Sequence, residues 1–434
     1  MEIEEFFNGF SKLTREQRFQ RLLEMGALNK SDIDYFKGGG VHDLSLADHF
    51  IENSIGYFQM PLGVATNFRI NGVARIIPMA VEETSIIAAA SKTARWVRQN
   101  GDIKAWTEGN CIIGQVQISR VKDFDRLKEA LARNKQDWID ELNREVALSM
   151  VLRGGGVRDI TLRKVERGDQ THMAVFHVLF NPCDAMGANI INQVCEYLKG
   201  PIEVSSGESV TMSILSNLVD TKLTISEVTL NNIPADMGEK IQEASLFAEM
   251  DPYRAATHNK GVLNGIDPIL IATGNDWRAV EAGIHAFACR AGHYSSITKW
   301  RYQNKTLIGR FTAPLIVGTV GGVTSLHPTA KICLAMLNVK DASELAQICA
   351  AVGLVQNLGA LKALTTVGII EGHMKLHIKN LTLGVGANEK ESKPLQKRLE
   401  QLLAVKKRIS HSDAWQILQN IRHSEPIAQE TSLS

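Results

Sequence analysis

The sequence predicts an α+β fold in which a small ferredoxin-like domain is inserted into a larger α/β domain. The chain has 434 residues, of which 44% are hydrophobic, so it can bury a core large enough for two or three domains. Predicted strands and helices between residues 110 and 218 follow the order β-α-β-β-α-β, the split βαβ pattern of ferredoxin-like domains. Glycine-rich turns before apolar helices recur after residue 220, which fits a large α+β domain.

The composition excludes several classes of protein. With 48 basic and 47 acidic residues the net charge is +1, which gives no general attraction to nucleic acid or to an anionic membrane. We expect no membrane-spanning helix, because no continuous apolar run approaches the required length, and the acidic, then amphipathic N-terminus does not resemble a signal peptide. The six cysteines include no CxxC pair. They indicate reduced, mostly buried thiols in a cytoplasmic protein.

The N-terminal part begins with helical periods over residues 1–36, which a triple glycine (38–40) ends. A plain loop is favoured there over a phosphate-binding loop, because no Lys-Ser/Thr follows. Extended strands are predicted over residues 56–64 and 68–80, with Asn71-Gly72 as a hairpin turn.

Two acidic residues, Glu82 and Glu83, stand with Ser85 before an alanine-rich helix predicted over residues 86–99. Acids at the start of a helix complement its dipole, which is a sufficient structural reason for both. A buried member of the pair would instead have a raised pKa and could act as a proton donor. The residues alone leave both alternatives open.

The predicted insert has its own strands and helices. They are a strand at 111–120, a helix at 122–151, strands at 157–166 and 171–181, a helix at 185–199 and a strand at 208–216. Phe176 and Phe180 alternate on one strand as they do in some RNA-binding sheets, but the basic excess and the accompanying motif are missing. We therefore predict that both rings lie in the core.

The second helix of the insert begins at Asp-Ala-Met-Gly-Ala-Asn (184–189). Asp184 can cap the helix, and Gly187 and Ala188 remove bulk, so a phosphate or pyrophosphate could lie against the helix N-terminus. Packing is the alternative reason for small residues at this point, and the sequence has no GxGxxG.

The richest stretch, residues 254–283, reads RAATHNKGVLNGIDPILIATGNDWRAVEAG. We predict a buried strand at 269–272 between two polar turns, with the second turn capping a helix. Lys260 and Asp276 would then lie at opposite ends of a segment roughly 25 Å long. The concentration of polar residues beside an apolar run indicates a functional site.

The remaining elements are predicted from their periodicity. They are a strand at 221–230, a helix at 235–250, a strand at 306–317, helices at 328–338 and 341–354, and a basic helical appendage at 393–408 and 411–422. His373 and His377 are spaced as zinc ligands on a helix, but no third ligand stands at a diagnostic spacing. We predict no metal site.

Eight motifs in this order resemble those of one enzyme family. They are ENSIG with PLGVA (52–65), MAVEETSIIAAAS (79–91), DAMGAN (184–189), RAATHNKG with NGID (254–267), ATGNDWRAVEAG (272–283), GTVGG (318–322), QNLGA (356–360) and GHM (372–374). The chain is similar, over nearly its whole length, to the soluble bacterial class II form of 3-hydroxy-3-methylglutaryl-coenzyme A (HMG-CoA) reductase.

The resemblance implies the organisation of the chain. It implies a large acyl-CoA-binding domain (1–109 and 219–376), an inserted domain that binds the nicotinamide dinucleotide (110–218) and a mobile C-terminal flap (377–434). It also implies homodimers, and it allows higher oligomers built from such dimers. The active sites would lie at the subunit interface, which would include the ENSIG region. The partners implied are HMG-CoA, mevalonate and CoA, with neither nucleic acid nor membrane.

The resemblance also implies roles for residues in a reaction that interconverts HMG-CoA and mevalonate plus CoA by two hydride transfers. Lys260 would stabilise the oxyanion, Glu83 would donate a proton, Asp276 would hold these two in a coupled network, and His373 would protonate the CoA thiolate. The residues that would bind the substrate are Ser85, Arg254, Asn264, Gln356 and Ala360. The residues that would bind the cofactor are Asp184, Met186, Gly187, Ala188 and Asn189.

The resemblance leaves the cofactor open between NAD and NADP. Closeness to members that degrade mevalonate favours NAD, but the acidic or basic residue that would meet the adenosine ribose cannot be located. The candidates are Glu145, Arg153, Arg158 and Asp159. Two rival functions are another acyl-CoA-dependent dehydrogenase, which could use Cys183 as a nucleophile, and a non-catalytic CoA- or nucleotide-binding protein.

Overall fold

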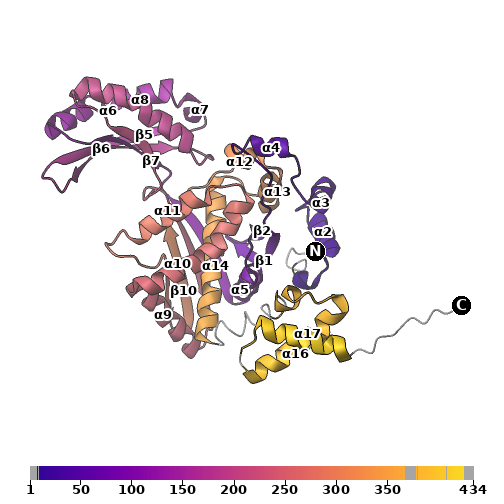
Figure 1. Cartoon of the computed structure of the whole chain (residues 1–434). Coiled ribbons are helices and arrows are strands. Elements are labelled where there is room, and N and C mark those ends of the chain that lie inside the picture. Colours follow the sequence, from indigo (N-terminus) through magenta and orange to yellow (C-terminus); the bar gives the residue numbers. More distant parts are fainter. Residues whose placement is uncertain (1–6, 8, 367–377, 379, 407, 425–434) are drawn as a thin grey trace. The chain divides into compact units, whose positions relative to one another are not determined.

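The computed structural model describes residues 7, 9–366, 378, 380–406 and 408–424, and it has the mixed α/β fold that the sequence predicts (Figure 1). Its internal contacts divide the chain into two compact units, Met1–Leu361 and Lys362–Ser434.

The N-terminal segment of the first unit is helical and leads into a two-stranded hairpin. Its elements are η1 (Phe10–Lys12), α2 (Arg15–Glu24), α3 (Lys30–Lys37), α4 (Leu44–Asp48), β1 (Leu62–Ile70) and β2 (Val73–Ala80). The predicted hairpin turn is confirmed, since Asn71 and Gly72 have φ angles of 51° and 79°, both left-handed. The Asn71 side chain also donates to the Ala105 carbonyl at 2.8 Å and accepts from the Ala105 amide at 2.9 Å, which fastens the turn to the next sheet.

The main sheet of this unit is antiparallel, with strand order β3-β8-β10-β9. The strands of this sheet and the helices of the same part of the chain are α5 (Ile86–Asn100), β3 (Gly101–Glu108), β8 (Leu223–Leu230), α9 (Ala235–Met250), α10 (Pro252–Ala272), α11 (Trp277–Ala288), β9 (Thr298–Gln303), β10 (Thr306–Ala313), α12 (Gly322–Leu326), α13 (Pro328–Leu337) and α14 (Ala342–Thr365). Trp300 and Phe311 are fully buried in the core between the sheet and the helices. The predicted helix at 235–250 is confirmed.

The strand predicted at 269–272 is wrong, because these residues form the last turn of α10. The predicted turn around Lys260 is likewise helical. Gly265, in the middle of this helix, permits close contact between α10 and α14. A Cβ there would lie 2.8 Å from the Val352 carbonyl oxygen and 2.9 Å from the Gly353 Cα. The apolar run is continuous because this end of α10 is buried among other helices.

The segment between β3 and β8 forms a second antiparallel sheet with its own core, in strand order β5-β6-β4-β7. Its elements are β4 (Ile112–Ile118), α6 (Phe124–Glu145), α7 (Leu148–Val151), β5 (Gly156–Glu166), β6 (His172–Asn181), α8 (Ala188–Ser206) and β7 (Met212–Ser216). Both long helices, α6 and α8, cover one face of this sheet (Figure 1). Phe176 and Phe180 are fully buried, so the prediction that they are core residues is confirmed.

The second unit is built around α16 (Glu389–Lys406) and α17 (His411–Ser424), close to the two helices predicted there. The two helices enclose a small core of their own, in which Leu395, Leu399 and Leu418 have no exposed surface. The Arg422 guanidinium donates to the Glu391 carboxylate at 2.8 and 3.1 Å and ties the end of α17 to the start of α16.

Among the described residues, α14 alone is long and apolar enough to span a membrane. Its apolar window is 67% buried inside the protein. The polar Gln356 and Asn357 interrupt the apolar sequence of the helix and are themselves buried. The composition of α14 is therefore that of a core helix against which α10 packs.

Candidate active site

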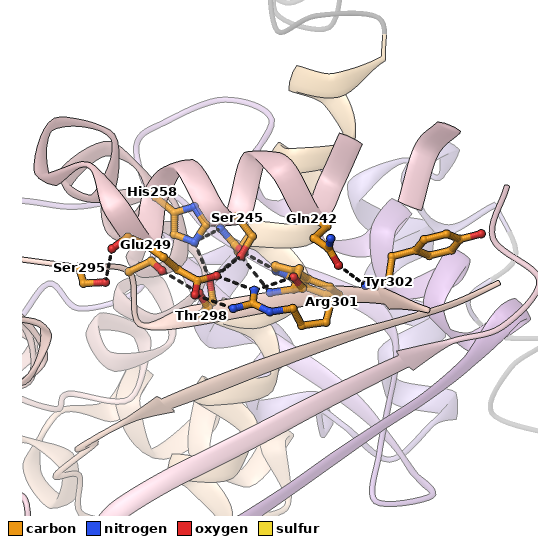
Figure 2. Close-up of polar contacts among 11 residues, drawn as sticks. Gln242, Ser245, Glu249, His258, Ser295, Thr298, Arg301 and Tyr302 are labelled. Carbon is orange, nitrogen blue, oxygen red and sulfur yellow. Dashed lines mark hydrogen bonds and ion pairs between the residues drawn. The ribbon is translucent and has the colours of Figure 1, made fainter. Parts of the chain in front are cut away.

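The position of α10 is fixed by a buried polar network on its inner face. The Nε2 atom of His258 on α10 lies 2.5 Å from Thr298 Oγ1 of β9 (Figure 2). The side-chain amide nitrogen of Asn357 on α14 lies 3.2 Å from the same Nε2 atom. The next residue, Asn259, accepts from the Ile297 amide at 3.0 Å and donates to the Ser295 carbonyl at 3.0 Å. These bonds hold α10 against β9 and α14.

His258 is neutral in this network. Burial, with a smaller contribution from the charge of Arg254, lowers the pKa of His258 to about 3. Beside it, Arg301 makes a two-pronged ion pair with Glu249, at 2.7 Å for each contact (Figure 2). His258 and Asn259 thus have a structural role. The next residue, Lys260, lies on the outer face of α10.

Lys260 meets Glu83 on that outer face. Its ammonium Nζ lies 3.2 Å from Glu83 Oε2, although the two residues are 177 positions apart. Glu83 belongs to the connection between β2 and α5, and Lys260 to the middle of α10. The two side chains are 43% and 62% exposed respectively. The sequence argument made proton donation by Glu83 depend on burial, and the isolated chain does not supply that burial.

Two polar residues predicted to bind the substrate have groups free for a ligand. Ser85 is the N-cap residue of α5 with φ 78°, a strained left-handed conformation, and its hydroxyl makes no capping bond. The half-buried guanidinium of Arg254 makes no ion pair or side-chain hydrogen bond with any described residue, and burial lowers its pKa. An unpaired, partly desolvated guanidinium is suited to bind a carboxylate.

The other residues predicted to act on the substrate lie in different settings. Asn264 is one turn beyond Lys260 on the same face of α10 and is partly exposed. Asp276 caps α11, as the sequence predicted, by accepting from the Ala279 amide at 3.2 Å, and it also pairs with Arg278 at 3.2 Å. Within the described chain Asp276 makes no ion pair with Lys260, so the predicted network of three charged groups stays a prediction.

The loop of residues 184–189 packs against two other motif loops. The Asp184 carbonyl accepts from the Thr319 amide at 2.9 Å, and the Gly318 amide donates to Asn275 Oδ1 at 2.8 Å. A Cβ on Gly318 would lie 2.7 Å from the Met186 nitrogen. Three motifs that are distant in the sequence, around residues 186, 275 and 318, therefore meet.

Asp184 was expected to cap the helix that follows it, and this is wrong. Its Oδ1 accepts from the Ala342 amide at 3.1 Å and so caps α14 instead. The N-cap of α8 is Gly187, which has φ 91° and provides no capping side chain. A Cβ there would lie 2.6 Å from Pro182 and 2.7 Å from Ile112, so both the conformation and the packing require glycine. The first amides of α8 are left without a side-chain cap.

A small cavity that opens to solvent adjoins this loop. Met186 and Ala188 line it from the loop and the start of α8, and Asn217 lines it from the chain after β7. Ala279, in the first turn of α11, also lines it. Asn189, the last residue of the motif, is exposed.

Four residues complete the predicted set. Gln356 is only 8% exposed, its Oε1 has no hydrogen-bond partner among the described residues, and its Cβ faces Gly265 across the α10–α14 contact. Ala360, one turn further along α14, is partly exposed. His373 lies outside the described residues. Cys183, the alternative nucleophile, has its sulfur 3.5 Å from the Arg153 carbonyl.

The sequence reasoning missed a pair of carboxyl groups, Asp267 and Glu281. Burial, followed by the neighbouring charge of Glu281, raises the pKa of Asp267 to about 8. Asp267 follows Lys260 by seven residues and so lies on the same face of α10. That spacing could have revealed it, had the segment been predicted as helix instead of turn and strand.

Comparison with known proteins agrees with this geometry. The hydroxymethylglutaryl-coenzyme A reductase family model matches residues 14–378. The 3-hydroxy-3-methylglutaryl-coenzyme A reductase of Archaeoglobus fulgidus is 40% identical over 388 residues, which is 88% of each chain. A solved reductase structure from Streptococcus pneumoniae has a TM-score of 0.81 and 36% identity, and covers 96% of this chain and 100% of that one.

A second solved structure is the class II reductase of Streptococcus pneumoniae bound to NADPH in open conformations. It has a TM-score of 0.80 and 36% identity, over 83% of this chain and 100% of that one. The fold and these matches define a nicotinamide-dependent oxidoreductase. The chain belongs to the hydroxymethylglutaryl-coenzyme A reductase family, as its motifs predicted, and it is an enzyme that reduces HMG-CoA with NAD(P)H.

Proposed function

We propose that Glu83 and Lys260 are the catalytic pair that acts on the acyl carbon of HMG-CoA. The observation that carries this proposal is their 3.2 Å contact, made by two partly exposed side chains from separate elements. An exposed ion pair of this kind contributes little to stability, so stability alone is a poor reason for bringing these charges together.

Lys260 stabilises the oxyanion in this proposal. Addition of hydride to the thioester carbonyl leaves a negative charge on oxygen, and an ammonium already in place stabilises that charge without reorganising. The buried bonds of His258 and Asn259 support this role, since they fix the helix that carries Lys260. The nicotinamide, when bound, supplies the hydride.

Glu83 donates the proton in the second reduction, from aldehyde to alcohol. In the isolated chain its carboxylate accepts from Lys260. A substrate seated over the pair would exclude water from Glu83, which favours the protonated acid. Asp276 is proposed to join the pair when the site is complete, and its position at the start of α11 leaves part of its carboxylate exposed for this purpose.

The hydroxymethylglutaryl group is held by Arg254, Ser85 and Asn264. The unpaired guanidinium of Arg254 would take the free carboxylate of the substrate, and the uncapped hydroxyl of Ser85 and the amide of Asn264 would bind its oxygens. Gln356 and Ala360 stay predicted contacts of the CoA arm, although the burial of Gln356 limits it to a ligand that reaches between α10 and α14.

His373 is proposed, from the family resemblance, to protonate the departing CoA thiolate from the hinge that precedes the C-terminal flap. His373→Gln should then slow reduction of the thioester more than reduction of free mevaldehyde, which releases no thiolate. Equal losses in both reactions would contradict this assignment.

The dinucleotide is proposed to bind at the start of α8. The uncapped amides there suit a pyrophosphate, and Met186 and Ala188 border a cavity. These residues fit the cofactor. The preference for NAD stays a prediction, since the Streptococcus pneumoniae enzyme was bound to NADPH. Two of the acidic residues that could meet the adenosine ribose already form ion pairs, Glu145 with Arg144 and Asp159 with Lys135.

A homodimer in the cytoplasm is also proposed, with residues 52–56 in its interface. Ile55 and Phe58 support this, since they are 99% and 94% exposed in the single chain. Such apolar exposure is typical of an interaction surface. Light scattering coupled to size-exclusion chromatography measures the assembly directly.

The decisive assay follows absorbance at 340 nm in both directions. HMG-CoA with NADPH or NADH should give oxidation of the cofactor, and mevalonate plus CoA should give reduction of NADP or NAD. Acetyl-CoA serves as the control substrate and should not react. Turnover of acetyl-CoA without turnover of HMG-CoA would favour the rival acyl-CoA dehydrogenase.

A further inference from the structure

The carboxyl groups of Asp267 and Glu281 form a second charged cluster next to the proposed catalytic pair. Asp267 lies on α10, on the same helical face as Lys260 and Asn264, and Glu281 lies on α11. The residues are partly buried, and the two helices are in contact. No role assigned so far explains why two acids should meet there.

The surroundings of Asp267 require a proton. Its Oδ1 is fully buried and meets no hydrogen-bond donor among the described residues. The side chain that it contacts is the carboxyl of Glu281, to which it is hydrogen-bonded. Two carboxyl groups can form such a bond only if one of them carries a proton. The pair therefore holds one shared proton and one negative charge.

The groups that act on Asp267 come from three helices. Glu281 on α11 and burial favour the protonated form, and the ammonium of Lys260 on α10 opposes it. The group on the third helix is the thiol of Cys349 on α14, which is neutral and fully buried. Lys260 is thus the cation that senses whether the pair carries one negative charge or two.

We propose that Asp267 and Glu281 are positioning residues for Lys260, and that their shared proton keeps the ammonium directed outward toward Glu83 and the substrate oxyanion. When the pair loses this proton, a second negative charge appears beneath Lys260 and draws the ammonium inward, away from the acyl carbon. This inference rests on the proposed role of Lys260. It adds a control of that role by groups that do not touch the substrate.

The consequence is an alkaline limit on turnover. The raised pKa of about 8 belongs to the pair as a whole. At pH 9, one unit higher, roughly one molecule in ten keeps the shared proton, so kcat should be about one-tenth of its value at pH 7. The structure predicts that this ratio depends on having both acids.

Two variants fix the charge of the pair at a single negative value. In Asp267→Asn only Glu281 ionises, and in Glu281→Gln only Asp267 ionises. The ratio of kcat at pH 9 to kcat at pH 7, measured at 340 nm with HMG-CoA and NADPH, should rise from about one-tenth in the wild type to near one in both variants. A ratio that stays at the wild-type value in both variants would overturn the proposal.

The stability of the same proteins provides a second readout if a variant has no activity. The folded-state pKa of Asp267 is raised, so its stabilising contribution is complete below about pH 4 and is lost as the pH rises to about 8. The melting temperature of the wild type should therefore fall more steeply than that of Asp267→Asn between pH 5 and pH 8. Equal slopes would refute the shared proton. A wild type inactive with HMG-CoA would refute the proposed function instead.

Discussion

Replacement of Lys260 by alanine separates a catalytic role from a structural one. The Lys260 and Glu83 side chains are 62% and 43% exposed, so solvent screens their attraction. An exposed ion pair contributes roughly 0 to 1 kcal/mol to stability. Loss of a group that stabilises an oxyanion costs about 3 to 4 kcal/mol of activation free energy, or two to three decades in kcat. Lys260→Ala should therefore lose at least a hundredfold in kcat and melt within about 2 °C of the wild type.

A control lysine of similar exposure is available on α9. Lys240 pairs with Asp236, one turn away on the same helix, at 2.8 Å, and its side chain is 54% exposed. Lys240→Ala should melt as Lys260→Ala does and keep wild-type turnover.

The assay is the oxidation of NADPH at 340 nm under saturating HMG-CoA, together with thermal melts of all three proteins. Near-normal kcat in Lys260→Ala would refute the catalytic assignment. A melting temperature that falls by many degrees in Lys260→Ala alone would instead mean that the ion pair is structural, contrary to the reasoning from exposure.

Three further predictions concern packing, pH and the rival mechanism. Gly265→Ala should destabilise the protein by about 1 to 2 kcal/mol, because the added Cβ meets backbone atoms of α14 at 2.8 and 2.9 Å. Gly261→Ala should instead raise the melting temperature, because no atom lies within 4 Å of a Cβ there. A higher melting temperature for Gly265→Ala than for Gly261→Ala would contradict the helix contact. The lowered pKa of His258 predicts that stability falls as the pH drops from 6.5 toward 3, by up to about 1.4 kcal/mol per pH unit, and that His258→Gln flattens this slope in denaturation series. Cys183→Ala should keep its turnover, and its inactivation would revive a covalent mechanism.

Features that depend on neighbouring residues could be predicted from the sequence. The Asn71-Gly72 turn was found because left-handed φ angles favour these two residues. Asp276 was recognised as a helix cap because a polar residue preceded a helical period. The order of strands and helices in the insert followed from periodicity in the same way.

Features that depend on distant contacts could not be predicted in this way. Gly265 looks like a turn residue in sequence. It is a helix-packing residue because a Cβ at this position would lie within 3 Å of the backbone of α14. Asp184 caps α14, which begins 158 residues later, and not the helix next to it. In both cases the sequence carried the right residue type but not the element that it serves.

The proposed catalytic pair came from family resemblance and not from physical reasoning. Periodicity gave the wrong element for Lys260 and no reason to bring Glu83 near it. The structure adds what the resemblance did not include, namely Asp267 on the face of α10 that carries Lys260 and its contact with Glu281. A helix prediction for this segment would have aligned Lys260, Asn264 and Asp267.

The central claim is that Glu83 and Lys260 act as one unit on the acyl carbon. The most direct measurement is a double-mutant cycle of kcat with HMG-CoA and NADPH, using Glu83→Gln, Lys260→Ala and the double variant. Residues that act as a unit lose their function together, so the double variant should be no more than a few-fold slower than the slower single variant. A double variant whose loss equals the product of the two single losses would mean that the two residues act independently.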